Sequence, residues 1–138
     1  MVGRIVRAAD FERVLQRPAR ARSVHFAIHH LPAPPAMPEL STAQADAPTE
    51  GVDEFALPVF FGSVVPKKLA RRAVTRNLVK RQIRAAAARH AGALPGGLWV
   101  VRLRTPLAPG RWPSAGSAPL RGLLRGELDA MLSGIGRR

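Results

Sequence analysis

The sequence predicts a two-layer α/β sandwich, and three patterns indicate it. Residues 23–31 alternate apolar and polar side chains as a half-buried strand does, and residues 57–65 and 98–103 are short apolar runs. Residues 8–16, 70–90 and 119–132 carry apolar side chains at helical spacing. The order helix, strand, strand, helix, strand, helix favours a sheet with helices packed on one side, in which residues 57–103 form a β–α–β crossover.

The N-terminal part predicts one helix followed by one strand. In the helix over 8–16, Phe11, Val14 and Leu15 lie at i, i+3 and i+4, and Pro18 ends it. In the strand over 23–31 the side chains separate into two faces. One face consists of Val24, Phe26 and Ile28, and the other of His25, Ala27 and His29.

Glycines and prolines predict where the remaining helices and strands bend or end. In the strand over 57–65, Gly62 indicates a bend or a close approach of another group. Glycines and a proline over 92–97 end the long helix, and a Pro/Gly loop over 105–117 separates the third strand from the last helix. The last helix has Leu120, Leu123, Leu124, Leu128 and Met131 at helical spacing.

The charge distribution predicts a polyanionic partner. The chain has 138 residues, with 22 Lys and Arg against 9 Asp and Glu, a net charge of +13. From residue 55 to residue 126 it carries 14 basic residues and no acidic one. A face that served only solubility would mix both signs, so this segregation favours binding of nucleic acid.

The composition of residues 32–53 predicts a disordered insertion within one nucleic-acid-binding domain over 1–138. They are rich in Pro, Ala and acids and lack both apolar periods. The chain has no cysteine, which excludes disulfides and Cys-ligated metals. It also shows neither a secretory signal nor a membrane span, so we expect a cytoplasmic location.

The strongest motif is the basic helix itself. Arg76, Lys80 and Arg84 follow one another at i, i+4 and i+8, with Asn77 and Arg81 alongside. These five side chains occupy an arc of about 140°, with apolar residues beyond both edges, Val74 and Ala85 among them on one side. The Asn77 amide suits either a base edge or 2′-hydroxyl, or a loop of the protein. Without acidic neighbours the stripe repels itself, which a phosphate backbone would relieve.

Two lysines extend this charge to the start of the helix. Lys67 and Lys68 follow Pro66 at the end of a strand. Free N–H groups at the nearby helix N-terminus also favour an anion. The sequence therefore predicts one continuous basic surface.

This stretch resembles the protein component of bacterial ribonuclease P. The resemblance is carried by Phe61-Gly62-Ser63-Val64-Val65-Pro66-Lys67-Lys68, by Arg76-Asn77-Leu78-Val79-Lys80-Arg81 with Arg84, and by Asp10-Phe11-Glu12-Arg13-Val14 and Phe26-Ala27-Ile28. It covers nearly the whole chain outside 32–53. It implies a ribosomal-protein-like fold with a left-handed crossover through the basic helix, where general rules predict a right-handed one.

The resemblance also implies a function and the residues that serve it. In the family an RNA subunit cleaves precursor tRNA with Mg²⁺, and the protein binds that RNA and the 5′ leader of the substrate. The RNA-binding positions are Lys67, Lys68, Arg71, Arg72, Arg76, Asn77, Lys80, Arg81 and Arg84. The leader-cleft positions are Phe11, Leu15, Ala27, His29 and Val64. The chain departs from the family's pattern at Leu78, usually Arg, and at Leu15 and His29, often aromatic. Phe11 could equally be a core residue.

We expect neither a catalytic residue nor a metal ligand in the protein. Outside residues 32–54 only four acidic residues occur, in two helices, and the four histidines show no ligand spacing. A ribosomal or ribosome-assembly protein is the main alternative, because it would share the size and charge. A helix-turn-helix DNA-binding protein lacks support, since no second helix follows after a short turn. No membrane association and no obligate protein partner are indicated.

Overall fold

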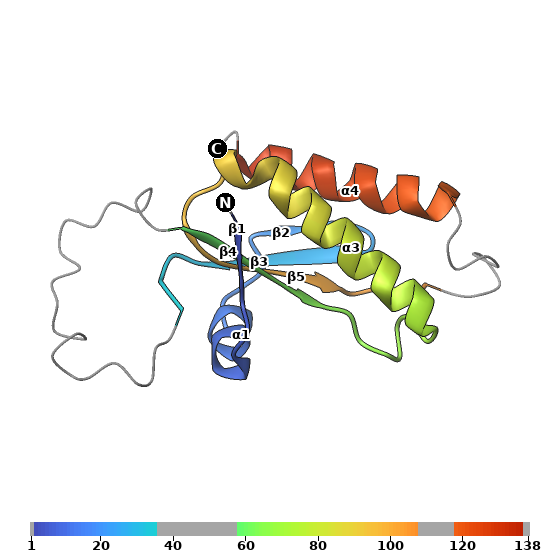
Figure 1. Cartoon of the computed structure of the whole chain (residues 1–138), viewed down its shortest axis with the longest axis horizontal. Coiled ribbons are helices and arrows are strands. Elements are labelled where there is room, and N and C mark those ends of the chain that lie inside the picture. The colour runs from blue at the N-terminus through green and yellow to red at the C-terminus, as the bar shows by residue number, and fades with distance from the viewer. Residues whose placement is uncertain (1, 36–57, 108–117, 137–138) are drawn as a thin grey trace, which may run out of the picture.

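The computed structural model describes residues 2–35, 58–107 and 118–136 (Figure 1). The elements are β1 (Val2–Arg4), α1 (Ala8–Leu15), β2 (Ala21–Arg22), β3 (Phe26–Leu31), β4 (Val59–Val64), α3 (Ala73–His90), the 3₁₀ turn η2 (Ala91–Ala93), β5 (Gly97–Leu103) and α4 (Ala118–Gly136). The predicted insertion falls mostly on residues 36–57, outside the described residues. No helix in the described ranges is long and apolar enough to cross a membrane.

The five strands form one mixed sheet in the order β1-β4-β5-β3-β2. β1, β4 and β5 are parallel to one another, whereas β3 pairs antiparallel with β5 and β2 antiparallel with β3. The sequence analysis missed β1 and β2. They have three and two residues, too few for an alternating pattern to be recognised.

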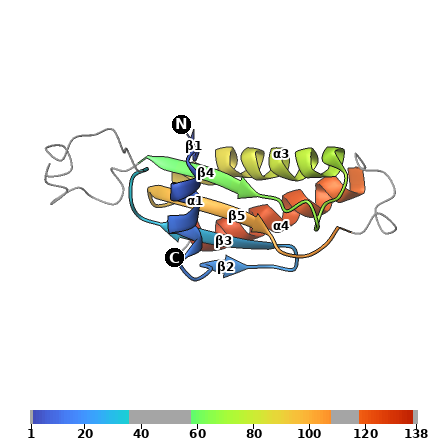
Figure 2. The same ribbon diagram turned by 90° about the horizontal axis from the view of Figure 1, so that it is seen from below.

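The central strand β5 is covered on both faces of the sheet. Trp99, Val101 and Leu103 belong to the apolar cluster beneath α3 and α4. Leu98 and Val100 belong to a second cluster with residues of α1. Figure 2 shows α1 in front of the sheet and the other two helices behind it. The prediction that all helices pack on one side was therefore wrong, because β5 is apolar on both faces and each face needs cover.

The crossover from β4 through α3 to β5 is left-handed. In Figure 2 both strands point to the right, β5 lies below β4, and α3 runs behind them. When this view is turned so that the strands point up, β5 lies to the right of β4 while α3 lies behind the sheet. This is the left-handed arrangement, because a right-handed crossover would place the helix in front. This confirms the hand that the family resemblance implied, against the general preference.

His30 packs against Trp99, a member of the apolar cluster beneath α3 and α4. Its ring stacks on the indole, with 4.0 Å between the ring centroids. The Arg20 guanidinium lies 2.8 Å from His30 Nδ1, and His30 Nε2 lies 3.0 Å from the Gly96 carbonyl oxygen. Because a guanidinium can only donate, Nδ1 accepts and Nε2–H donates to the carbonyl. This buried histidine is thus satisfied in its neutral form.

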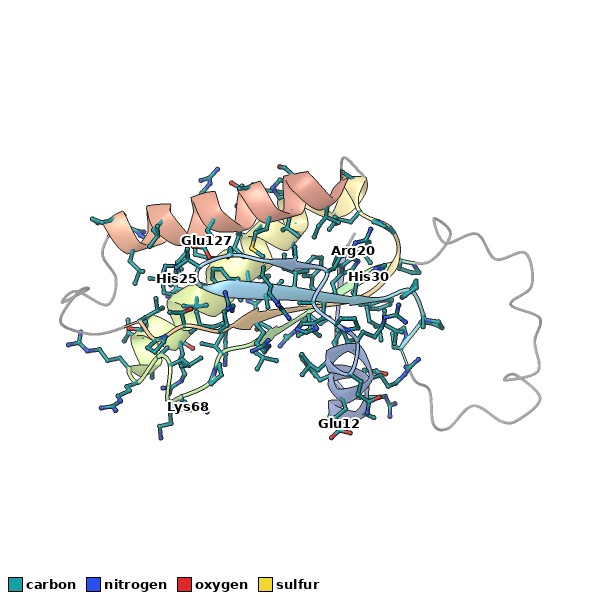
Figure 3. All side chains as sticks on the ribbon, turned by 180° about the vertical axis from the view of Figure 1, so that it is seen from behind. Glu12, Arg20, His25, His30, Lys68 and Glu127 are labelled. Carbon is teal, nitrogen blue, oxygen red and sulfur yellow. The ribbon has the colours of Figure 1, made fainter. Side chains whose placement is uncertain are left out.

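Glu127 fastens α4 to the turn before β3. Its carboxylate accepts hydrogen bonds from the Ser23 hydroxyl and from the His25 backbone N–H at 2.8 Å, and its other oxygen lies 2.8 Å from His25 Nδ1 (Figure 3). Burial raises the pKa of Glu127, but the hydrogen bonds from Ser23 and His25 outweigh that effect and lower the pKa below its ordinary value. The ionised carboxylate therefore stabilises the fold.

We expect Glu127→Gln to lower the free energy of unfolding by about 1–2 kcal/mol at neutral pH, because charge-assisted hydrogen bonds are lost. The pKa is lower in the folded than in the unfolded chain. The stabilisation is therefore present above the ordinary Glu pKa and disappears as the pH falls through the lowered value. In urea unfolding, the difference in unfolding free energy between this variant and the wild type should be smaller at about pH 3 than at about pH 7. Glu12→Gln, at an exposed position of α1, is the control; equal effects of the two changes would contradict this role.

Candidate RNA interface

Helix α3 has one buried face and one exposed basic face. The buried side chains are Thr75, Leu78, Val79, Ile83, Ala86 and Ala87. The exposed ones include Asn77, Lys80, Arg81 and Arg84. The predicted stripe is therefore accessible along most of its length. Leu78 lies in the core at 4 % exposure, so it is unavailable for the contact that an Arg at this position would make.

Two details of the predicted helix faces were wrong. Val74 is 55 % exposed, and Ala85 is exposed as well, although both were expected at an apolar edge. Leu78, which the spacing places at that same edge, is buried, as are Val79, Ile83 and Ala86 at the opposite edge. The exposed arc of α3 is consequently wider than the five polar residues require, and it includes small side chains.

Arg76 differs from the other members of the stripe. It is half-buried, and its Nη1 donates to the backbone carbonyls of Ala70 at 3.0 Å and of Arg71 at 2.9 Å. The guanidinium therefore fixes the turn that precedes the helix. This contact was not foreseen, because it depends on the conformation of the turn at residues 70–71, which helical spacing does not predict.

The turn before α3 brings the remaining predicted cations together. Lys67, Lys68, Arg71 and Arg72 are all exposed there, and Figure 3 shows Lys68 projecting away from the domain. The first turn of α3 contains no acidic residue, and no side chain caps its N-terminus. The free N–H groups and the helix dipole add to the attraction for an anion at this end.

The acidic side chains in the described part of the chain lie on α1 and α4, away from the stripe. Asp10 pairs with Arg13 of the same helix, and Asp129 of α4 lies 2.7 Å from Arg89. Burial raises the pKa of Asp129, but Arg89 and His90 outweigh this and lower it. No described acid pairs with Lys80, Arg81 or Arg84. These three exposed side chains of α3 thus keep their positive charge.

The predicted leader-cleft residues lie on the other face of the sheet, beside α1. Phe11, Leu15 and Val64 are half-buried against the smaller apolar cluster. Phe11 also lies over Gly62, where a Cβ would stand 2.5 Å from its ring, which confirms the predicted close approach. Phe11 therefore has a packing role, and its partial exposure leaves a surface for a ligand as well.

Ala27 and His29 are on the expected face but are buried, at 0 % and 6 % exposure. His29 Nδ1 lies 2.9 Å from the Arg17 carbonyl oxygen. Its Nε2 is buried and has no hydrogen-bond partner among the described residues. The sequence placed His29 correctly but did not show that α1 and its flanking loop cover the ring. As it stands, the ring offers no open platform for stacking a base.

Strand register adds two arginines that the sequence analysis did not single out. Arg22 pairs with Ala27, Ala27 with Arg102, and Arg102 with Val64. Residues that pair across strands share a face, so Arg22 and Arg102 flank Ala27 on the cleft side. The signal was present as a single Arg in the apolar run over 98–103. Only the register, however, shows which residues lie beside it.

The fold and its charge define a class: a small basic α/β domain with cationic groups on both faces of one sheet. A family model for ribonuclease P matches residues 2–116. The ribonuclease P protein component of Bordetella parapertussis is 32% identical over 134 residues, covering 97% of this chain and 92% of that protein. The chain belongs to the ribonuclease P protein family.

Other relatives agree with this assignment. The ribonuclease P protein component of Burkholderia mallei is 43% identical over 76 residues, which span 55% of this chain and 56% of that protein. The solved ribonuclease P protein of Staphylococcus aureus superposes with a TM-score of 0.60 at 21% identity, covering 94% of this chain and 92% of that one. The Thermotoga maritima protein gives 0.58 at 20% identity, with 96% of each chain covered. At these identities the structures support the fold alone.

We expect Lys80→Ala and Arg84→Ala to weaken RNA binding without loss of stability, because both side chains are exposed and free of described ion pairs. Each lost phosphate contact should reduce the slope of log K against log salt by about 1. Filter binding over a salt series measures this, with Arg121→Ala on α4 as the control. An unchanged slope in both variants would contradict the assignment of α3 as the RNA face.

Arg76→Ala should behave differently from those two variants. Removing its guanidinium leaves the carbonyls of Ala70 and Arg71 without their donor, so we expect a loss of about 1–3 kcal/mol in unfolding free energy. Thermal or urea unfolding tests this directly. Stability equal to that of Lys80→Ala would show that the turn does not depend on Arg76.

Proposed function

We propose that this chain is the protein subunit of ribonuclease P, which binds the catalytic RNA and the 5′ leader of precursor tRNA and so assists removal of the leader. The observation that carries the proposal is the separation of two basic surfaces by one sheet. Together with the family membership, it supports a protein that holds two RNA elements at once.

The face formed by α3 suits a structured RNA. Its side chains project from a rigid helix that is packed on the sheet, so their spacing is fixed before binding. Arg81 and Arg84 can donate several hydrogen bonds to phosphate oxygens, and Asn77 can both donate and accept. We assign Lys67, Lys68, Arg71, Arg72, Asn77, Lys80, Arg81 and Arg84 to contact with the RNA subunit. Arg76 is assigned to the same surface as a positioning residue.

The face beside α1 suits a single strand. Phe11, Leu15 and Val64 offer partly exposed apolar surface, and Arg22 and Arg102 provide two cations in one row across the strands. Single-strand binders combine a basic groove with stacking surfaces in this way. With Ala27 and His29 buried, we assign phosphate contacts a larger share of leader binding than base stacking.

The proposal assigns the chemical step to the RNA subunit and its Mg²⁺. Among the described residues, no group of three His, Asp or Glu side chains is placed to hold a metal ion. The protein's part is to bring the leader and the catalytic RNA together and to reduce repulsion between their phosphates, in the cytoplasm of the cell.

Reconstitution tests the proposal. The full chain, added to a bacterial ribonuclease P RNA and a precursor tRNA at low Mg²⁺, should promote cleavage at the mature 5′ end, because bound protein screens phosphate repulsion. If the protein neither bound that RNA nor stimulated cleavage, the proposal would be contradicted and a ribosome-assembly protein would be favoured. Cleavage by the protein without the RNA would contradict the assignment of the chemical step to the RNA subunit.

We expect Arg102→Ala to weaken binding of precursor tRNA to the holoenzyme while leaving mature tRNA unaffected, because only the precursor carries a leader. The salt slope for the precursor should fall by about 1. Equilibrium binding of both tRNAs measures the difference, with Arg121→Ala as the control on the opposite face. A variant that weakens both tRNAs equally would place Arg102 outside the leader site.

A further inference from the structure

A groove lies between the edge of the sheet and helix α3, and its lining includes Phe11 of the leader cleft as well as Lys80 and Arg84 of the basic stripe. It has a volume of about 810 Å³ and is lined by parts of β1, β4 and α3. β1 ends at Arg4, and the Ile5 N–H makes the last hydrogen bond to this edge, to the Phe61 carbonyl at 3.1 Å. β4 continues to Val64, so beyond Phe61 this edge has no strand partner in the described part of the chain. The early end of β1 opens the groove.

Helix α3 contributes two kinds of surface to it. Lys80 and Arg84 stand at one end and are exposed. Further along, Ala87 and Ala88 of the helix and Ala91 of η2 line the wall with small side chains. Ile83 and Phe61 add buried apolar surface, at 3 % and 7 % exposure. No acidic residue is among the described lining.

This combination selects one class of occupant. An apolar slot with three cations, Arg4, Lys80 and Arg84, in its lining matches the flat base and the charged phosphate of a nucleotide. The unpaired edge of β4 at Ser63 provides a backbone donor and acceptor, which can bond to the edge of a base. Lys80 and Arg84 belong to the basic stripe, so the groove is continuous with the proposed RNA surface. A peptide strand added to the sheet edge would not use these cations unless it were acidic.

We propose that this groove, the β1–α3 groove, binds one unpaired nucleotide of an RNA strand. Its base lies against the accessible side chains of Ala88 and Ala91, and its phosphates contact Lys80 and Arg84. The inference rests on the proposed function in taking RNA as the ligand. It goes beyond that function by assigning a pocket for an extruded base, which gives the α3 face a means to distinguish a bulged or looped RNA from a regular duplex.

The test compares two exposed alanines of the same helix. Ala88→Leu fills the groove, whereas Ala85→Leu lies outside it, and both keep the charge and suit a helix. The probes are an oligoadenylate of about four nucleotides and an abasic ribose-phosphate oligomer of equal charge. NMR titration of the Ile83 and Ala87 methyl groups in the full chain reports binding.

Wild type and Ala85→Leu should bind the oligoadenylate about tenfold more tightly than the abasic oligomer, and Ala88→Leu should lose this preference. Equal affinity of wild type for both oligomers, or an unchanged preference in Ala88→Leu, would overturn the inference. Binding of ribonuclease P RNA to wild type is measured in parallel. Its failure would contradict the proposed function, whereas loss of the base preference alone would contradict only the β1–α3 groove.

Discussion

The double-sided burial of β5 is the constraint on which the other elements depend. Its side chains alternate between two apolar clusters, so one set of residues positions α3 and α4 and the other positions α1. β5 pairs with β4 on one side and with β3 on the other. It therefore fixes the positions of both the basic helix α3, which packs on it, and β3, which carries Ala27 and His29. Two surfaces that face opposite ways are thereby fixed in one rigid unit.

Charge is distributed in keeping with this architecture. The described acids that bridge different elements, Glu127 and Asp129, lie on α4 and bind partners on the β2–β3 turn and at the end of α3. These links stabilise the packing of α4 and leave the rest of α3 unneutralised. Under the proposed function, the phosphates of a bound RNA would offset the repulsion between these cations.

Local sequence patterns predicted what depends on local chemistry. The C-terminal end of α3, the alternation of residues 26–29 between the two faces of the sheet and the close approach at Gly62 followed from periodicity and residue type. What the sequence could not show depends on contacts between distant segments. The position of α1 across the sheet, the burial of His29 and the row formed by Arg22 and Arg102 all require the strand register. Arg76 shows both outcomes. Its position on the helix was predicted correctly, but the hydrogen bonds from its guanidinium to the carbonyls of the preceding turn were not.

The most direct measurement maps each face onto its RNA. Since the chain has no cysteine, one introduced by Ala85→Cys on α3 or by Glu12→Cys on α1 provides a unique attachment point for a hydroxyl-radical source. In the holoenzyme with precursor tRNA, the account predicts strand cleavage in the ribonuclease P RNA from the α3 position and in the 5′ leader from the α1 position. Cleavage of the same RNA segment from both positions would contradict the assignment of the two faces to two RNA elements.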